Sequence, residues 1–339
     1  VGNNYTIKDI AKRAQVGTTT VSRVLNNHPY VSDEKRQRVL NAMDELNYRQ
    51  NLGAKWLRSA STGLIGFLTD EVATTPYAVD IIRGAQDAAA ENDMVIIVVS
   101  VGGDLPEIEE AIEFLLERQV MGIIYAAMYH REVHLPDNIT NVPTALANCF
   151  SVDASLPSAV PDEETGAYRA TKVLLEAGHT RIGFINVIPP STPAMNGRLR
   201  GYQRALSDYG IPFDEQLIGT SDFALHNYNE TQRLLNLKNP PTAFFSGTDR
   251  TAMATYAALR DAGLRVPEDI SVVGFDNQID VALNLLPNLT TVQLPHYEMG
   301  AWAVRKLLSG DNEIIQEKID CPLVERQSVS VLDSVNIQS

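Results

Sequence analysis

Two short motifs occur twice in this chain, and both recur at the same spacing. Ile65-Gly66-Phe67 reappears as Ile182-Gly183-Phe184, and the pattern Arg-Gly-x-Gln-x-Ala that starts at Arg83 starts again at Arg200, so both pairs lie 117 residues apart. One such match can arise by chance, but two at one offset indicate a duplicated unit. The repeats therefore predict two similar lobes.

From Leu64 onward, short apolar runs rich in β-branched residues alternate with stretches of helical periodicity. The runs are LIGFLTDE, VIIVVS, MGIIYAA, TALANCF, RIGFINVI, LIGTSDF, TAFFSGTD and ISVVGFDN. Helices are expected between them, near residues 79–92, 106–118, 164–177, 199–209, 230–237 and up to 262. This alternation is typical of parallel sheets covered on both faces. Ligands of open α/β sheets bind beyond the carboxyl ends of the strands, so two such lobes can share one cleft that opens and closes.

Residues 5–57 follow a different pattern. Thr6 and Asp9 form a weak capping box in front of a short helix, and Gln15-Val16-Gly17 interrupts that helix before a second one begins at Thr18. Ser32 is the expected cap of a third helix, with acidic residues in its first turn. Two short helices joined by a tight turn and braced by a third predict a helix-turn-helix, whose second helix can enter the major groove of DNA.

The charge distribution supports that interpretation. Residues 1–60 hold ten Lys and Arg against five Asp and Glu, a net of +5, whereas the remaining residues hold eighteen against thirty-seven, a net of −19. A basic head on an acidic body is typical of a protein that binds phosphate groups through one end only. The alternative interpretation is a small three-helix bundle that docks another protein.

The chain of 339 residues is too long for one core and suits two or three domains. Two cysteines, Cys149 and Cys321, are too few for a disulfide framework. No stretch resembles a signal peptide, and the longest apolar run is far shorter than the roughly 20 residues of a membrane span. We therefore expect a cytoplasmic protein without a membrane partner.

Residues 51–58 (NLGAKWLR) link the head to the body and leave two interpretations open. The linker is only about two turns long, too short to be a stable helix alone. Its apolar residues Trp56 and Leu57 either dock on the body, or Leu57 inserts between base pairs in the minor groove when a helix forms on DNA.

Several stretches together resemble the lactose-repressor (LacI/GalR) family of bacterial transcription regulators. They are TIKDIAKRA, TVSRVLN, VSDEKRQRVLNAMDELNY, IGF, GHTRIGFI, GRLRGY, LRVPEDISVVGFDN and LTTVQ, and they cover residues 5 to about 332 in order. The resemblance implies an α/β chain with an N-terminal helix-turn-helix head at 1–50, a hinge helix at 51–60, and a periplasmic-binding-protein-like core of two parallel-sheet lobes at 61–339. Lobe 1 is expected at about 61–160 and 293–323, and lobe 2 at about 161–292 and 324–339. The resemblance also implies double-stranded operator DNA as partner, a homodimer or tetramer, and a small effector in the cleft that changes operator affinity.

The resemblance assigns DNA-facing positions to Thr6, Thr18, Thr19, Ser22, Arg23 and Asn26 in the head and to Ala54 and Leu57 in the hinge. Threonine hydroxyls pair with base edges or phosphate, and an arginine can fork onto guanine or grip phosphate. For Ser22 and Asn26, local backbone bonds are the alternative. The head departs from the family at Gln15 and Gly17, where the family usually has Gly and Ser. A left-handed Gln15 would cost about 1 kcal/mol.

The resemblance assigns the effector site to Tyr77, Asn148, Arg198, Phe223, Asp249 and Asp276. A guanidinium can span two adjacent sugar hydroxyls, a carboxylate accepts from them, and an aromatic ring covers the apolar sugar face. For Arg198 and Asp276 the alternative is a buried structural ion pair. For Tyr77 and Phe223 it is ordinary packing, and for Asp249 it is helix capping.

The sequence thus predicts a DNA-binding repressor controlled by a small molecule, most simply a sugar; the alternative is the same regulator controlled by a protein partner or a non-sugar metabolite. An enzyme is disfavoured, because no phosphate-binding glycine loop, nucleophile elbow or metal-spaced His/Cys/carboxylate set is found, and no cofactor is expected. His130 and His134 lack a third ligand and are expected in a loop. Because no heptad run follows Leu332, a dimer is favoured over a tetramer.

Overall fold

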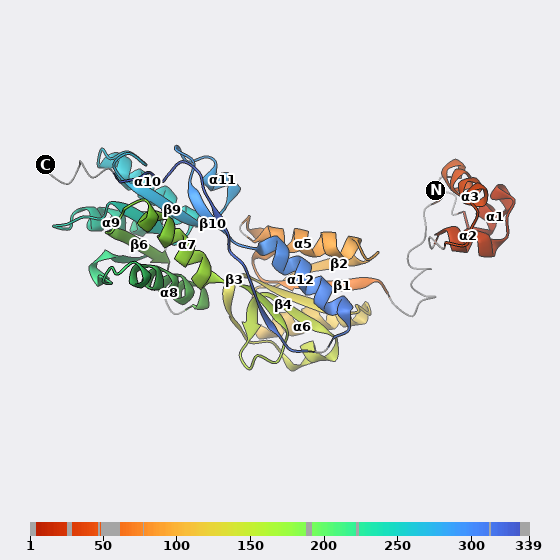
Figure 1. Cartoon of the computed structure of the whole chain (residues 1–339). Helices are drawn as coiled ribbons and strands as arrows, with labels where there is room; N and C mark the ends of the chain where they lie inside the picture. Colours follow the sequence, from red (N-terminus) through yellow and green to blue (C-terminus); the bar gives the residue numbers. More distant parts are fainter. Residues whose placement is uncertain are drawn as a thin grey trace. The chain divides into compact units, whose positions relative to one another are not determined.

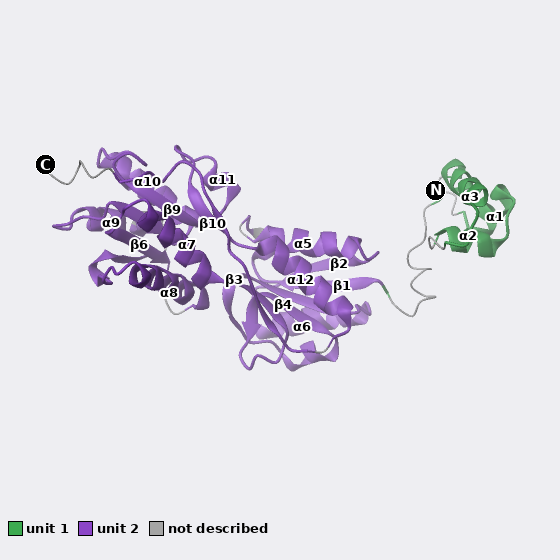
Figure 2. Ribbon diagram, in the orientation of Figure 1, with its two compact units in different colours: residues 1–62 green, residues 63–339 purple. Residues whose placement is uncertain are grey.

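The computed structural model describes residues 5–25, 29–46, 48, 62–76, 78–187, 192–221, 224–311 and 313–332. The chain divides into two compact units, residues 1–62 and residues 63–339, which are considered separately below (Figure 2). We call them the head and the core.

Within its described residues, the head contains α1 (Ile7–Ala14), α2 (Thr18–Leu25) and α3 (Asp33–Glu45). Each helix is amphipathic, and the apolar faces meet in one small core built around the fully buried Ile10, Val21 and Val39. The expected three-helix arrangement is confirmed.

The core contains two sheets (Figure 1), and their strands follow the same order. Among the described residues, the first sheet has six strands: β1 (Leu64–Thr69), β2 (Val95–Ser100), β3 (Ile123–Val133), β4 (Thr144–Ser151), β5 (Ser158–Pro161) and β11 (Gln316–Ile319). The second has β6 (Ile182–Val187), β7 (Ile218–Ser221), β8 (Ala243–Ser246), β9 (Ser271–Asp276), β10 (Thr290–Gln293) and β12 (Leu323–Val324). The orders are β11-β5-β4-β3-β1-β2 and β12-β10-β9-β8-β6-β7. The neighbouring strands run parallel, except that β12 is antiparallel to β10. The predicted parallel sheets are confirmed.

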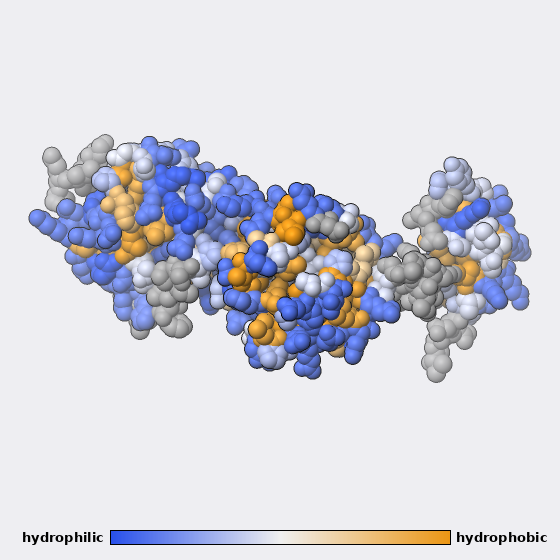
Figure 3. Space-filling view, turned by 90° about the horizontal axis from the view of Figure 1, so that it is seen from below, coloured by the Kyte–Doolittle hydropathy of each residue, from blue (hydrophilic) through white to orange (hydrophobic). Residues whose placement is uncertain are grey.

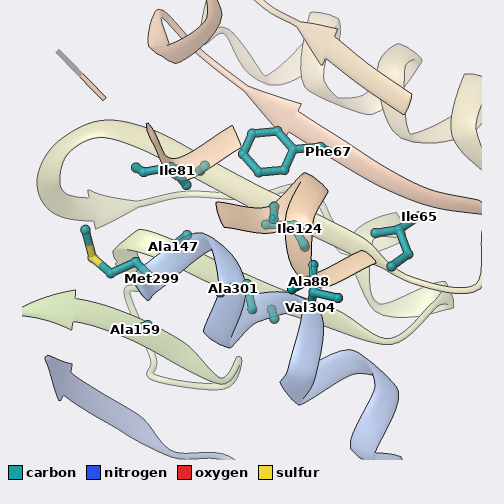
Figure 4. Close-up of a cluster of buried hydrophobic side chains, with 14 of the residues drawn as sticks. Ile65, Phe67, Ile81, Ala88, Ile124, Ala147, Ala159, Met299, Ala301 and Val304 are labelled. Carbon is teal, nitrogen blue, oxygen red and sulfur yellow. The ribbon is translucent and has the colours of Figure 1, made fainter. Parts of the chain in front are cut away.

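Helices cover both faces of each sheet. In the first lobe, α5 (Val79–Ala90) and α12 (His296–Ser309) bury one apolar cluster against the sheet (Figure 4), and α6 (Leu105–Glu117) buries another on the opposite face. In the second lobe, α7 (Glu163–Glu176) and α8 (Pro193–Asp208) lie on one face, while α9 (Ala224–Leu235) and α10 (Asp249–Asp261) lie on the other. The short α11 (Ile279–Ala282) follows β9. This double coverage explains why the strands read as continuous apolar runs.

The chain passes between the two lobes at three places within the described core. It leaves the first sheet after β5 and enters α7, returns after β10 into α12, and leaves again after β11 into β12. Three adjacent crossing segments can act as a hinge.

The repeated Arg-Gly-x-Gln-x-Ala motif has a packing role. Gly84 on α5 lies so close to α12 that a Cβ atom there would be 1.9 Å from the carbonyl oxygen of Tyr297. In the second lobe, a Cβ at Gly201 on α8 would be 2.2 Å from the carbonyl oxygen of Glu164 on α7. Glycine therefore permits the same close helix crossing in each lobe, and the duplication predicted from the 117-residue spacing is visible in three dimensions.

Three expectations about local structure were wrong. The helix expected near 230–237 begins earlier, at Ala224, and ends at Leu235. The helix expected at 199–209 begins at Pro193, because Thr192 caps it and proline is compatible with the first helical position. His130 lies in β3 rather than in a loop: after a register irregularity, residues 131–133 resume pairing with β4. No helix among the described residues is long and apolar enough to cross a membrane.

Candidate functional site

The residues expected to contact DNA lie on the solvent-facing side of α2. Val21 and Val24 point into the head core, whereas Thr18, Thr19 and Arg23 are exposed and Ser22 is half-buried. The side chains available for base or phosphate contact therefore gather at the start and along one side of the helix. Asn26, Ala54 and Leu57 lie outside the described residues.

Thr6 belongs to the local structure of α1. Its backbone N–H and its hydroxyl both donate to the Asp9 carboxylate at 2.7 Å, which satisfies the start of the helix. These hydrogen bonds lower the pKa of Asp9, the side-chain bond from Thr6 contributing most. The expected capping box is confirmed, and Thr6 remains exposed at the surface of the head.

The turn between α1 and α2 keeps a left-handed residue despite its unusual sequence. Gln15 adopts φ 55° and ψ 46°, which answers the question that the sequence left open, and Gly17 accepts the first hydrogen bonds of α2 through its carbonyl oxygen. Arg38 on α3 donates to the carbonyl oxygens of Ala14 at 2.6 Å and of Gln15 at 3.0 Å. This arginine thus satisfies the end of α1 and fixes the turn that places α2.

A cavity of about 1360 Å³ in the core lies between the two lobes. Asn148, Arg198 and Asp276, three of the expected effector residues, line it together. Tyr77 and Phe223 lie outside the described residues. The other lining residues on the first-lobe side include Met128, Tyr129 and His130, and those on the second-lobe side include Glu163, Met195, Gln278 and Leu294.

Arg198 is the buried centre of the second-lobe wall, with a relative exposure of 3%. Its Nε donates to Glu163 at 2.8 Å, Nη1 donates to the carbonyl oxygen of Gly247, and its guanidinium lies 4.0 Å from the Phe275 ring centroid. Its Nη2 is 3.5 Å from the Asp276 carboxylate. The expected residues Arg198 and Asp276 thus form an ion pair and also face the cavity, so the two interpretations offered by the sequence coexist.

Asp276 ends β9 and accepts a hydrogen bond from the Gln278 side chain at 3.1 Å. Burial raises the pKa of Asp276 to about 7; Arg198 opposes this shift, and the charge of Glu163 adds to it. Burial likewise raises the pKa of Glu163 against the opposing effect of Arg198. Two carboxylates therefore compete for one guanidinium in a poorly solvated wall.

Asp249 lies behind the cavity wall and is not one of its lining residues. Its carboxylate accepts from the Gln278 backbone N–H at 2.7 Å and from the Thr291 hydroxyl at 2.5 Å. Thr248, rather than Asp249, caps α10. Asp249 thus fixes the backbone beyond Asp276 and the neighbouring strand, and burial followed by the charge of Asp276 raises its pKa well above the ordinary range.

The backbone is unusual at two places that face the cavity, inside β4 and at the end of the equivalent strand β9. Asn148 has φ 59°, Asp276 has φ 113° and Asn277 has φ 52°. Asparagine tolerates the left-handed region, but the Asp276 conformation is strained for a residue with a side chain. Strain of this kind gathers at ligand sites, where surrounding contacts hold side chains in a required direction.

Sequence reasoning missed Glu163 and His130. The side chain of Asp162 caps α7. The carboxylate of the next residue, Glu163, points into the cleft and accepts a hydrogen bond from Arg198. His130 Nδ1 lies 4.0 Å from Glu163, and burial lowers the pKa of His130 to about 4, with Arg198 and Lys318 adding to that effect. The position of Glu163 directly after a crossover strand was the available signal; His130 depended on strand pairing that the sequence did not reveal.

Comparisons with known proteins agree with this geometry. Residues 6–51 match the model of bacterial regulatory proteins, lacI family, and residues 171–329 match that of periplasmic binding protein-like domains. The Escherichia coli sucrose operon repressor is 34% identical over 332 residues, covering 95% of this chain and 99% of that protein.

Two solved structures extend the similarity to the whole chain. The Lac repressor dimer bound to operator and the anti-inducer ONPF aligns with a TM-score of 0.70 and 27% identity, covering 97% of this chain and 100% of that one. The complex of the transcriptional regulator CelR with cellobiose aligns with a TM-score of 0.66 and 27% identity, covering 96% and 100%.

Proposed function

Because the chain belongs to the LacI family of bacterial regulatory proteins, we propose that it is a transcriptional repressor whose operator affinity is set by a sugar-type effector in the core cavity. The observation that carries this proposal is the joint presence, in one chain, of an exposed α2 face and a lobe-spanning cavity centred on Arg198 and Asp276. The first can read a duplex, and the second can sense a hydroxylated molecule.

At the DNA end, α2 enters the major groove with Thr18 and Thr19 leading, and Ser22, Arg23 and Asn26 following. The exposure of Thr18, Thr19 and Arg23 supports this assignment, and Thr6 lies beside phosphate at the start of α1. In the hinge, Ala54 allows close approach to DNA and Leu57 inserts into the minor groove.

At the effector end, the Asp276 carboxylate accepts hydrogen bonds from ligand hydroxyls, and the Asn148 amide accepts from or donates to them. Arg198 orients these hydroxyls. Tyr77 and Phe223 cover the apolar face of the ligand, and Asp249 acts from behind through the backbone after Asp276. The cavity volume of about 1360 Å³ is ample for a mono- or disaccharide. The similarity to a cellobiose complex supports a sugar as the class of effector.

The proposed active form is a homodimer, which matches a twofold operator. The edge strand β2 supports this, since Val95 and Val98 on it are 43% and 36% exposed, and an unpaired apolar edge favours association. Apolar residues also reach the surface of both lobes on the face shown in Figure 3.

The test starts by selecting a bound duplex from a random pool with the full chain and then measuring its affinity by fluorescence anisotropy in the presence of individual sugars. We expect one class of sugar to change the affinity at least tenfold. Leu57→Ala should weaken operator binding and reduce bending while leaving sugar affinity unchanged. No preference for any duplex over random DNA, with or without small molecules, would refute the proposal. Regulation that persists when the cleft is blocked would instead indicate control by a protein partner.

A further inference from the structure

The cavity wall contains more negative than positive charge. Among the described lining residues, the carboxylates are Asp80, Glu163, Asp276 and Asp280, and the cations are Arg198 and Arg250. Asp80, Asp280 and Arg250 are exposed at its edge, where water and salt screen them. The charges that matter inside are therefore two carboxylates and one guanidinium, with Asp249 behind them.

Arg198 is bonded more closely to Glu163 than to Asp276. Its Nε–H is directed at Glu163 and Nη1 at the Gly247 carbonyl oxygen, so the guanidinium is committed to the Glu163 side. Its approach to Asp276 is longer, at 3.5 Å, and the Asp276 side chain is only 12% exposed. The Asp276 carboxylate also accepts from the neutral Gln278 side chain at 3.1 Å, and a carboxylate with little water and one cation at 3.5 Å is costly unless a ligand supplies further charge.

A second observation points to a donor-rich ligand at the same place. His130 Nδ1 is buried and has no hydrogen-bond partner among the described residues. It lies 4.0 Å from the Glu163 carboxylate, too far for a hydrogen bond, and it faces Glu163 from the other lobe. Because burial lowers the pKa of His130 to about 4, its ring is neutral at physiological pH and can accept a hydrogen bond from a ligand.

Together these groups form an acceptor-rich pocket with a negative balance. An ammonium group offers three N–H donors and one positive charge, whereas a hydroxyl offers one donor and no charge. A phosphate would bring further negative charge against Glu163 and Asp276 in a medium where such charges interact strongly. Building on the function proposed above, we propose that the effector is a hydroxylated amine, such as an amino sugar, and that the cleft excludes phosphorylated sugars.

Matched ligands test this on the full chain by titration calorimetry at low salt. The panel contains D-glucose, D-glucosamine, N-acetyl-D-glucosamine and D-glucose 6-phosphate, with the corresponding galactose and mannose derivatives. We expect at least one free amine to bind tenfold or more tightly than its neutral parent and its N-acetyl derivative, and no phosphate ester to bind more tightly than its parent.

Variants identify the source of that preference. Asp276→Asn and Glu163→Gln should each reduce the ratio of amine to parent affinity at least tenfold, whereas Asp208→Asn, at an exposed carboxylate near the end of α8, should leave it unchanged. If Glu163→Gln fails to fold because Arg198 loses its partner, Asp276→Asn still supplies the comparison.

Tighter binding of a neutral or phosphorylated member overturns the amine proposal and leaves sugar control of the repressor intact. A panel in which no amine binds overturns it as well. If, in addition, no member binds or alters operator affinity, the small-molecule control proposed above also fails, so the two failures are distinguishable.

Discussion

Replacing Asp276 with asparagine should change how the stability of the core depends on pH. Burial raises the pKa of Asp276 from its ordinary value of 3.8 to about 7 in the folded protein. Between these values the folded state holds a proton that the unfolded chain has released, so stability falls as pH rises through this window. The effect is absent below about pH 4 and complete above about pH 7.

The difference between the two pKa values corresponds to an upper limit of ~4 kcal/mol. The carboxylate is 12% exposed and shares Arg198 with Glu163, so we expect a smaller measured effect, about 2 kcal/mol. Asparagine keeps the acceptor for the Gln278 side chain but carries no charge. Asp276→Asn should therefore gain about 2 kcal/mol over the natural chain between pH 5 and pH 8.

Urea unfolding of the full chain, followed by circular dichroism at pH 5, 6, 7 and 8, measures this difference. Asp208→Asn is the control, because it removes one exposed carboxylate near the end of α8. Parallel stability profiles for Asp276→Asn and the natural chain would refute the reasoning. They would mean that Asp276 is adequately compensated in the folded state.

Three further outcomes are expected. Gly84→Ala should destabilise the core by about 2 kcal/mol or more, because the added Cβ would clash with the Tyr297 carbonyl oxygen. Gly17→Ala is the control: its Cβ would meet nothing within 4 Å, so the free energy of core unfolding should change by less than about 0.5 kcal/mol. Gln15→Gly should stabilise the head by about 1 kcal/mol by removing left-handed strain, visible as a higher melting temperature of the head transition in calorimetry. Arg198→Ala should abolish the response to effector in an operator-binding assay while DNA binding without effector is retained; a normal response would remove Arg198 from the site.

The local elements were predictable because their causes are local. The Thr6–Asp9 box and the alternation of strands and helices depend on neighbouring residues or on periodicity. The duplication was predictable for another reason. The glycine at Gly84 and Gly201 is required by the same helix crossing, so the shared packing leaves a shared sequence pattern.

The cleft was only partly predictable because its contacts join distant segments. Arg198 and Asp276 stand in recognisable motifs, but Glu163 gains its role from the point where the chain enters the second lobe. His130 depends on the continuation of β3 past a register irregularity, which no local periodicity indicates. Asp249 stands at the first turn of a helix in the sequence, yet its side chain is directed at Gln278 and Thr291.

The two lobes share a topology but divide the chemistry of the cleft unequally, and that asymmetry gives a reason for coupling. Within the described residues, the nearly buried charged groups that line the cavity, Glu163, Arg198 and Asp276, all belong to the second lobe. The first lobe contributes neutral groups such as His130 and Asn148. Bringing the first lobe closer removes water from the charges of the second, which is unfavourable while Asp276 has only the Gln278 side chain at 3.1 Å and Arg198 at 3.5 Å as partners. A ligand that satisfies Asp276 removes this cost in the closed arrangement only, and such a differential interaction is what an effector needs in order to shift the population of lobe arrangements.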